Sequence, residues 1–168
     1  MSVQAPVPAK AAPKPGGPPG TVWTLAALMA LLAVGAIQGG WAMVTDPMSP
    51  LGMPVSYLEN APIGDYFLPG VFFLCIAAAS LLVAIGLVSH WRWRWAGGIE
   101  AVVGHRWPWI GAVAVGGALL AFEIIELFLV PFHPVMHPLL LAGSSAILLL
   151  PFTPSASRFL DARAGVGK

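Results

Sequence analysis

Charged residues are scarce in this sequence. Only 9% of its 168 residues are charged, while 58% are hydrophobic. A soluble domain carries about 25% charged residues. Because so few charges cannot cover a surface that faces water, the composition excludes an ordinary soluble protein and predicts an integral membrane protein.

Cysteine is almost absent as well. Cys75 is the only one and lies in an apolar run, which excludes an intramolecular disulfide and a metal site built on thiols alone. The sequence also has no nucleotide-binding motif and no nucleophile elbow. These absences leave the question of an enzyme open and favour a non-catalytic protein.

Long apolar runs predict an all-α fold, a four-helix transmembrane bundle of a polytopic membrane protein. A membrane-spanning helix needs roughly 20 mainly apolar residues, and the runs lack the period-2 alternation of barrel strands. The predicted spans are residues 22–44, 67–89, 108–130 and 135–152, the last being the shortest. Around this bundle of residues 22–152, we expect a disordered cytoplasmic tail (1–21), an outer lid loop (45–66) and a cytoplasmic C-terminal tail (153–168).

Basic residues are missing from the loops that follow the first and the third predicted spans. All eight lie in the two tails or in the loop between the second and third spans. The positive-inside rule therefore predicts that both termini are cytoplasmic. We expect a multi-pass protein of the plasma membrane, a bacterial inner membrane.

Aromatic and basic residues cluster where the chain is expected to meet the membrane interface. Interfacial Trp side chains and arginines that contact anionic headgroups are typical of such positions, so membrane lipids are the expected contact and nucleic acid is not. The predicted anchors are Trp41, Trp91, Arg92, Trp93, Arg94, Trp95, Trp107 and Trp109.

The loop after the first span has a distinctive pattern. It reads DPMSPLGMPVSYLENAPIGDYFLPG over residues 46–70. The pattern D-P-x-x-x-L-G-M-P followed by A-P-I-x-D-Y-F-L-P-G resembles a loop of an uncharacterised family of small four-span bacterial integral membrane proteins. The resemblance covers mainly residues 38–71 and the four-span layout, so it implies an architecture and no activity.

Small residues predict where helices approach each other closely. Gly35 and Gly39 form a GxxxG motif on the first span, and Ala112 and Gly116 form a similar pair on the third. Such pairs suit close contacts within the bundle or against another subunit.

Two glutamates interrupt the third apolar run. Glu123 and Glu126 are three residues apart, so they share one helix face. An ionised carboxylate costs about 2.5 kcal/mol or more at the centre of a span, and no Lys or Arg lies in any predicted span. The carboxyls must therefore be protonated, hydrogen-bond to a neighbour such as Gln38, bind a metal ion or meet a basic group of another chain.

Two histidines follow in the stretch HPVMHP. Because each precedes a proline, their spacing does not imply a pair on one helix face. Carboxylates and imidazoles together suit zinc, iron or manganese. A divalent metal with the ligands Glu123, Glu126, His133 and His137 is therefore a weak candidate, and a haem is less expected. The wider candidate site for ligand binding or proton handling comprises Gln38, Asp65, Glu123, Glu126, His133 and His137.

Three functions remain open at this point. The first is a small non-catalytic membrane subunit or accessory protein that acts through protein contacts, with a membrane-protein partner or a homo-oligomer. The second is a binding or transport protein with an outward-facing Glu/His pocket for a lipid, a small amphiphile, a proton or a metal. The third is a lipid-modifying enzyme that uses a glutamate as general acid or base. The alternative to all of these site hypotheses is that these side chains have a purely structural role.

Overall fold

The chain folds into helices joined by short loops. The computed structural model describes residues 17–89 and 96–165, and within these ranges it contains helices and turns but no strand. The helices are α1 (Gly20–Thr45), α2 (Phe67–Val88), α3 (Gly97–Val103), α4 (Trp107–Leu129), α5 (Met136–Leu149) and α6 (Pro154–Gly165), with short 3-10 turns η1 (Pro50–Gly52), η2 (Val55–Leu58) and η4 (Leu150–Phe152).

Three helices are long and apolar enough to cross a membrane, namely α1, α2 and α4. The predicted fourth span, residues 135–152, corresponds to Met136–Phe152, in which α5 continues into η4. This segment meets α6 at a bend of 59°, and within the described residues a fourth candidate span is counted only if the bent pair is taken as one. Pro151 and Pro154 lie at the bend and supply no backbone N–H, which explains the break.

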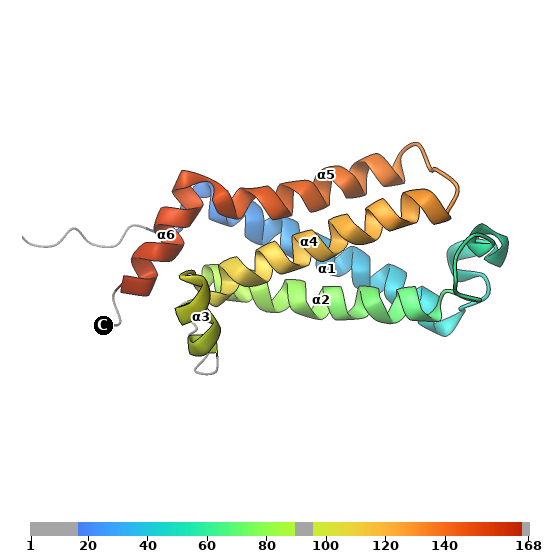
Figure 1. Cartoon of the computed structure of the whole chain (residues 1–168), viewed down its shortest axis with the longest axis horizontal. Coiled ribbons are helices and arrows are strands. Elements are labelled where there is room, and N and C mark those ends of the chain that lie inside the picture. The colour runs from blue at the N-terminus through green and yellow to red at the C-terminus, as the bar shows by residue number, and fades with distance from the viewer. Residues whose placement is uncertain (1–16, 90–95, 166–168) are drawn as a thin grey trace, which may run out of the picture.

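The long helices pack as two hairpins. Figure 1 shows α1 running along α2 and α4 running along α5. The two hairpins meet where α4 lies beside α2. The beginning of α1 meets the beginning of α6, where the hydroxyls of Thr21 and Ser155 are 3.0 Å apart. The beginning of α1 and the helix α6 therefore lie at the same end of the bundle (Figure 1).

Glycine allows the closest contacts within both hairpins. A Cβ atom added at Gly40 of α1 would lie 2.9 Å from the carbonyl oxygen of Gly70 on α2, and one added at Gly116 of α4 would lie 2.7 Å from the backbone nitrogen of Leu148 on α5. Backbones approach this closely only where no side chain intervenes, which is how helices gain packing energy without a hydrophobic driving force.

The GxxxG motif of α1 is not part of this packing. A Cβ atom added at Gly35 or at Gly39 would meet nothing within 4 Å. The close contact of α1 with α2 uses Gly40 instead, on the face that also buries Ala33 and Ala36. The face of α1 that carries Gly35 is left without a neighbour in the described part of the chain.

Two predicted interface anchors are core residues. Trp107 and Trp109 are each only 9% exposed and belong to the hydrophobic core. Trp107 fills the space over Gly86, and the Nε1–H of Trp109 donates a hydrogen bond of 3.1 Å to the carbonyl oxygen of Pro151. That carbonyl lies at the break after α5, where it satisfies the buried indole N–H.

The other predicted anchors have different outcomes. Trp41 is 63% exposed near the end of α1, as an interfacial side chain would be. Trp91, Arg92, Trp93, Arg94 and Trp95 lie outside the described residues.

Candidate metal centre between α4 and α5

A single helical hairpin carries the candidate site. Glu123 and Glu126 lie in the last two turns of α4, and His137 lies in the first turn of α5. Residues 130–135 connect the two helices. Because this connection is short, it returns the start of α5 to the carboxylate face of α4.

The exposed His133 has a structural role at the start of α5. Its Nδ1 accepts hydrogen bonds from the backbone N–H groups of Val135 (3.4 Å) and Met136 (3.2 Å), which are the free donors of a helix N-terminus. This differs from the expectation that both histidines belong to one metal site. The group of described residues whose ligand atoms converge comprises Glu123, Glu126 and His137 and does not include His133.

Glu123 and His137 form a buried pair. The carboxylate is 1% exposed and the imidazole 4%. The Oε2 atom of Glu123 lies 3.7 Å from Nδ1 of His137, and each of these two atoms is buried without a hydrogen-bond partner among the described residues. A separation of 3.7 Å is too long for a hydrogen bond, so two polar atoms face each other with neither satisfied.

The other ring nitrogen of His137 identifies its tautomer. Nε2 lies 3.5 Å from the carbonyl oxygen of Pro131, and because a carbonyl only accepts, Nε2 carries the proton in this long hydrogen bond. In the neutral ring Nδ1 then presents a lone pair toward Glu123. The ring of Phe132 stacks on the imidazole with centroids 5.4 Å apart, which holds its orientation.

Glu126 adds a second carboxylate to the pair. One ligand atom each from Glu123, Glu126 and His137 lies within 4.8 Å of the other two. Neither Lys nor Arg occurs in α4 or α5, so these helices offer no permanent positive charge to the carboxylates. A cation held between the three side chains would supply it.

Two predicted site residues lie elsewhere. Gln38 is exposed on the side of α1 that faces away from α2, so it is not the polar neighbour of the glutamates that the sequence suggested. Asp65 is half-buried, and its Oδ1 accepts a hydrogen bond of 3.0 Å from the backbone N–H of Phe67 at the beginning of α2. The depth of a residue along its predicted span can be read from the sequence, whereas the direction in which Gln38 points depends on how the hairpins dock.

Tyr66 was missed by the sequence analysis. Its side chain is buried, and its hydroxyl donates a hydrogen bond of 3.2 Å to the carbonyl oxygen of Pro54 while its backbone N–H bonds to Pro47 at 2.9 Å. It thereby ties the outer loop to the start of α2. The only available signal was its place between Asp65 and an apolar helix, which does not reveal a contact twelve residues away.

Comparisons with protein-family models, with curated proteins and with solved structures found no match to the chain. The resemblance of the loop at residues 46–70 to a family of four-span bacterial proteins therefore stays a prediction.

Proposed function

We propose that this chain is a metal-binding protein of a bacterial inner membrane, with both termini cytoplasmic and its Glu/His centre in the outer half of the bilayer. The orientation rests on the distribution of the eight basic residues. The metal site rests on one observation, the two unsatisfied buried atoms of Glu123 and His137 at a separation of 3.7 Å.

That separation favours an ion over a single bridging water. With metal–ligand bonds of about 2.0–2.2 Å, two ligand atoms on a tetrahedral zinc ion lie about 3.4 Å apart. A single bridging water with hydrogen bonds of about 2.8 Å would need an acute angle of about 80° between them. The 3.7 Å gap between Glu123 and His137 is close to the first geometry and strains the second.

The surroundings of His137 also suit a ligand. A metal-bound histidine usually donates its other ring N–H to a carbonyl or carboxylate, which fixes the tautomer that exposes the lone pair. The contact of Nε2 with the carbonyl of Pro131 is of this kind.

The ligand set selects a class of metal. One imidazole nitrogen and two carboxylate oxygens suit Zn²⁺, Fe²⁺ or Mn²⁺, whereas Ca²⁺ and Mg²⁺ prefer oxygen alone and Cu⁺ prefers thiolate or thioether sulfur. Zinc is the first ion to test because it accepts three protein ligands in a tetrahedral site.

Metal analysis of the purified full-length protein tests the proposal. After exposure to Zn²⁺ and desalting, we expect about one zinc per chain in the wild type and a loss of at least tenfold in affinity for Glu123→Gln and for His137→Asn. His133→Asn and Glu59→Gln are matched controls, since both side chains are exposed and outside the cluster, and they should bind zinc as the wild type does. A wild type that binds no zinc, or controls that lose it equally, would contradict the site.

A second candidate function is a subunit that acts through protein contacts in the bilayer. The observation that favours it is Gln38, an exposed amide in the middle of a spanning helix. Side-chain amides in lipid hydrogen-bond across helices. Crosslinking in native membranes should then trap a partner or a second copy through this face. A protein that runs alone after crosslinking would exclude this role.

A further inference from the structure

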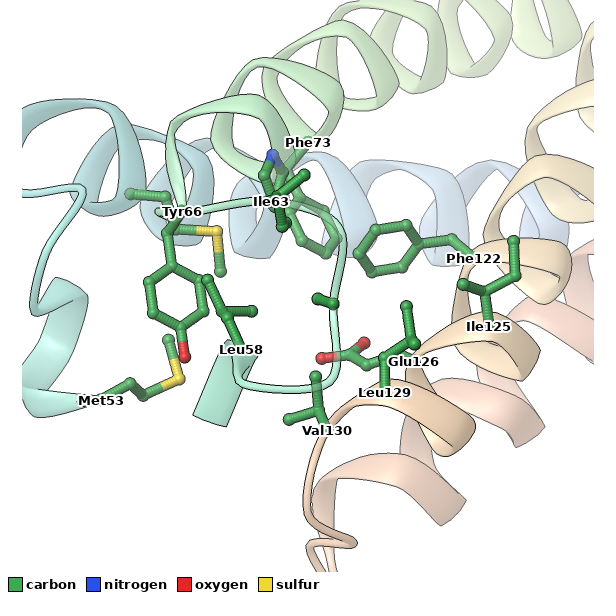
Figure 2. A pocket seen from close by; sticks show the side chains of 13 residues that line it. Met53, Leu58, Ile63, Tyr66, Phe73, Phe122, Ile125, Glu126, Leu129 and Val130 are labelled. Carbon is green, nitrogen blue, oxygen red and sulfur yellow. The ribbon is translucent and has the colours of Figure 1, made fainter. Parts of the chain in front are cut away.

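The outer loop covers an apolar cavity that reaches the candidate metal centre. The cavity has a volume of about 100 Å³ and lies between the loop and the ends of α1, α2 and α4. Figure 2 shows the loop residues on one side and the α4 residues on the other. Its lining comprises Met43, Met53, Leu58, Ala61, Ile63, Tyr66, Pro69, Phe73, Phe122, Ile125, Glu126, Leu129 and Val130.

Specific contacts hold the walls of this cavity. The loop is tied down by Tyr66, whose hydroxyl bonds to the carbonyl of Pro54. The opposite wall is an aromatic cluster in which Phe122 of α4 stacks on Phe72 (4.9 Å between centroids) and meets Phe73 edge-on (5.2 Å). Hydrogen bonds and aromatic packing from separate segments thus shape the space.

Glu126 is the single charged residue of the lining. Its carboxylate points from α4 into the cavity, toward Leu58 (Figure 2). Tyr66 is the other polar side chain there, and its hydroxyl is engaged by Pro54. The cavity is therefore apolar with one polar end, and that end belongs to the candidate metal ligands.

The position of the Glu126 carboxylate indicates from which side an incoming ligand would reach the ion. Glu123 and His137 are almost completely covered by protein and do not line the cavity. Three protein ligands leave one position of a tetrahedral ion open, as in catalytic zinc sites. Of the three candidate ligands, Glu126 lines this cavity, so a molecule in the cavity would approach the ion from the side of Glu126.

We infer that the cavity binds a small apolar molecule whose head group coordinates the metal ion, with the apolar part between the outer loop and Phe122. This rests on the proposed metal site. An apolar cavity of about 150 Å³ holds a benzene molecule, so the space of about 100 Å³ accepts a short alkyl chain or the end of a longer one. Carboxylate, thiol and hydroxamate heads are the ligand classes that suit the ion.

A series of straight-chain hydroxamates tests this inference on the full-length protein loaded with Co²⁺ in place of zinc. The metal content is measured first, and the visible absorption of the cobalt then reports binding of acetohydroxamate and its homologues up to eight carbons. We expect affinity to rise about fourfold per methylene group, until the chain fills the cavity at about four carbons, and then to level off.

Cavity-filling variants separate the alkyl site from simple partition into the membrane. Ala61→Phe, or Ala61→Leu if the loop does not tolerate the ring, should abolish the chain-length dependence and leave the metal content and the binding of acetohydroxamate unchanged. Ala121→Phe is the matched control, because Ala121 is exposed on α4 and outside the lining, and it should behave as the wild type does.

The outcomes distinguish the two proposals. Protein that holds no metal overturns the proposed function and this inference with it. Protein that holds metal and binds all hydroxamates equally overturns the inference alone. A chain-length dependence that persists in both Ala61 variants assigns the effect to the bilayer and likewise overturns it.

Discussion

Two polar side chains in the long helices have opposite surroundings. Glu123 lies between α4 and α5, almost fully buried and 3.7 Å from His137. Gln38 is exposed on α1, and within the described residues its amide has no hydrogen-bond partner. Polar groups in hydrocarbon require a partner. Glu123 faces His137 within its own hairpin, whereas no described residue is a partner for Gln38, so the first suits ligand binding and the second suits association.

The largest expected difference between the Glu123 region and the Gln38 region is in the thermal stability that the protein gains when it binds metal. At free zinc about 100 times the dissociation constant, an ion bound only by the folded state adds about 2.7 kcal/mol, which for a chain of this length raises Tm by about 5–10 °C. A chelator should remove this gain from the wild type and from Gln38→Leu. Thermal melts followed by tryptophan fluorescence, with and without chelator, measure it.

Glu123→Gln should show no shift with the chelator. An equal shift in this variant would mean that zinc stabilises the protein at some other place.

The second prediction concerns the metal-free protein. Glu123→Met replaces a buried group that lacks a hydrogen bond by an apolar one of similar size, which should stabilise the fold by about 1–3 kcal/mol. Gln38→Met should leave the free energy of unfolding within about 0.5 kcal/mol, because the side chain is exposed. Denaturant titrations in the presence of a chelator compare the two. Destabilisation by Glu123→Met would show that the carboxylate is already well bonded without an ion.

The third prediction concerns association. If the amide of Gln38 bonds across helices, Gln38→Leu should weaken self-association or partner binding by about 0.6–2 kcal/mol, or about 3- to 30-fold. Energy transfer between labelled chains in vesicles measures this affinity. Ile37→Leu, at the neighbouring exposed position, is the control, and equal affinities for both variants would remove Gln38 from any interface.

The smallest effect is expected in the outer loop. Tyr66→Phe removes one hydrogen bond and should cost about 1 kcal/mol, seen as faster hydrogen exchange in residues 46–66. Burial, and secondarily Glu126 and Tyr57, raise the pKa of Tyr66 above its ordinary value of 10.0. A raised folded-state pKa means that this contribution is fully present below about pH 10 and is lost as the pH rises through the shifted pKa.

Hydrogen exchange of the loop should therefore differ between wild type and variant by the same factor at pH 6 and pH 9. A difference that varies within this range would point to another titrating group.

Apolar patterning is enough to locate the helices, because the length of an apolar run is a local property. The helices α1, α2 and α4 begin and end within two residues of the runs at 22–44, 67–89 and 108–130. The break after α5 was also signalled locally, by Pro151 and Pro154. The predicted fourth span ends at residue 152, just before this bend.

The site was predictable only in part, because tertiary contacts decide the remainder. The pairing of Glu123 with His137 follows from a short connection between two helices, so sequence separation indicated it. Gln38 and His133 were grouped with them by depth and residue type. Their actual contacts depend on the docking of α1 and on the free backbone donors at the start of α5, which residue type alone does not specify.

The three candidate ligands lie within residues 123–137, on one hairpin with a short turn. The carboxylates and the imidazole that faces them therefore lie on one helical pair, and their proximity does not require a third helix. Its transfer onto an unrelated pair of antiparallel helices would carry the whole ligand set, which makes it a portable module for membrane protein engineering.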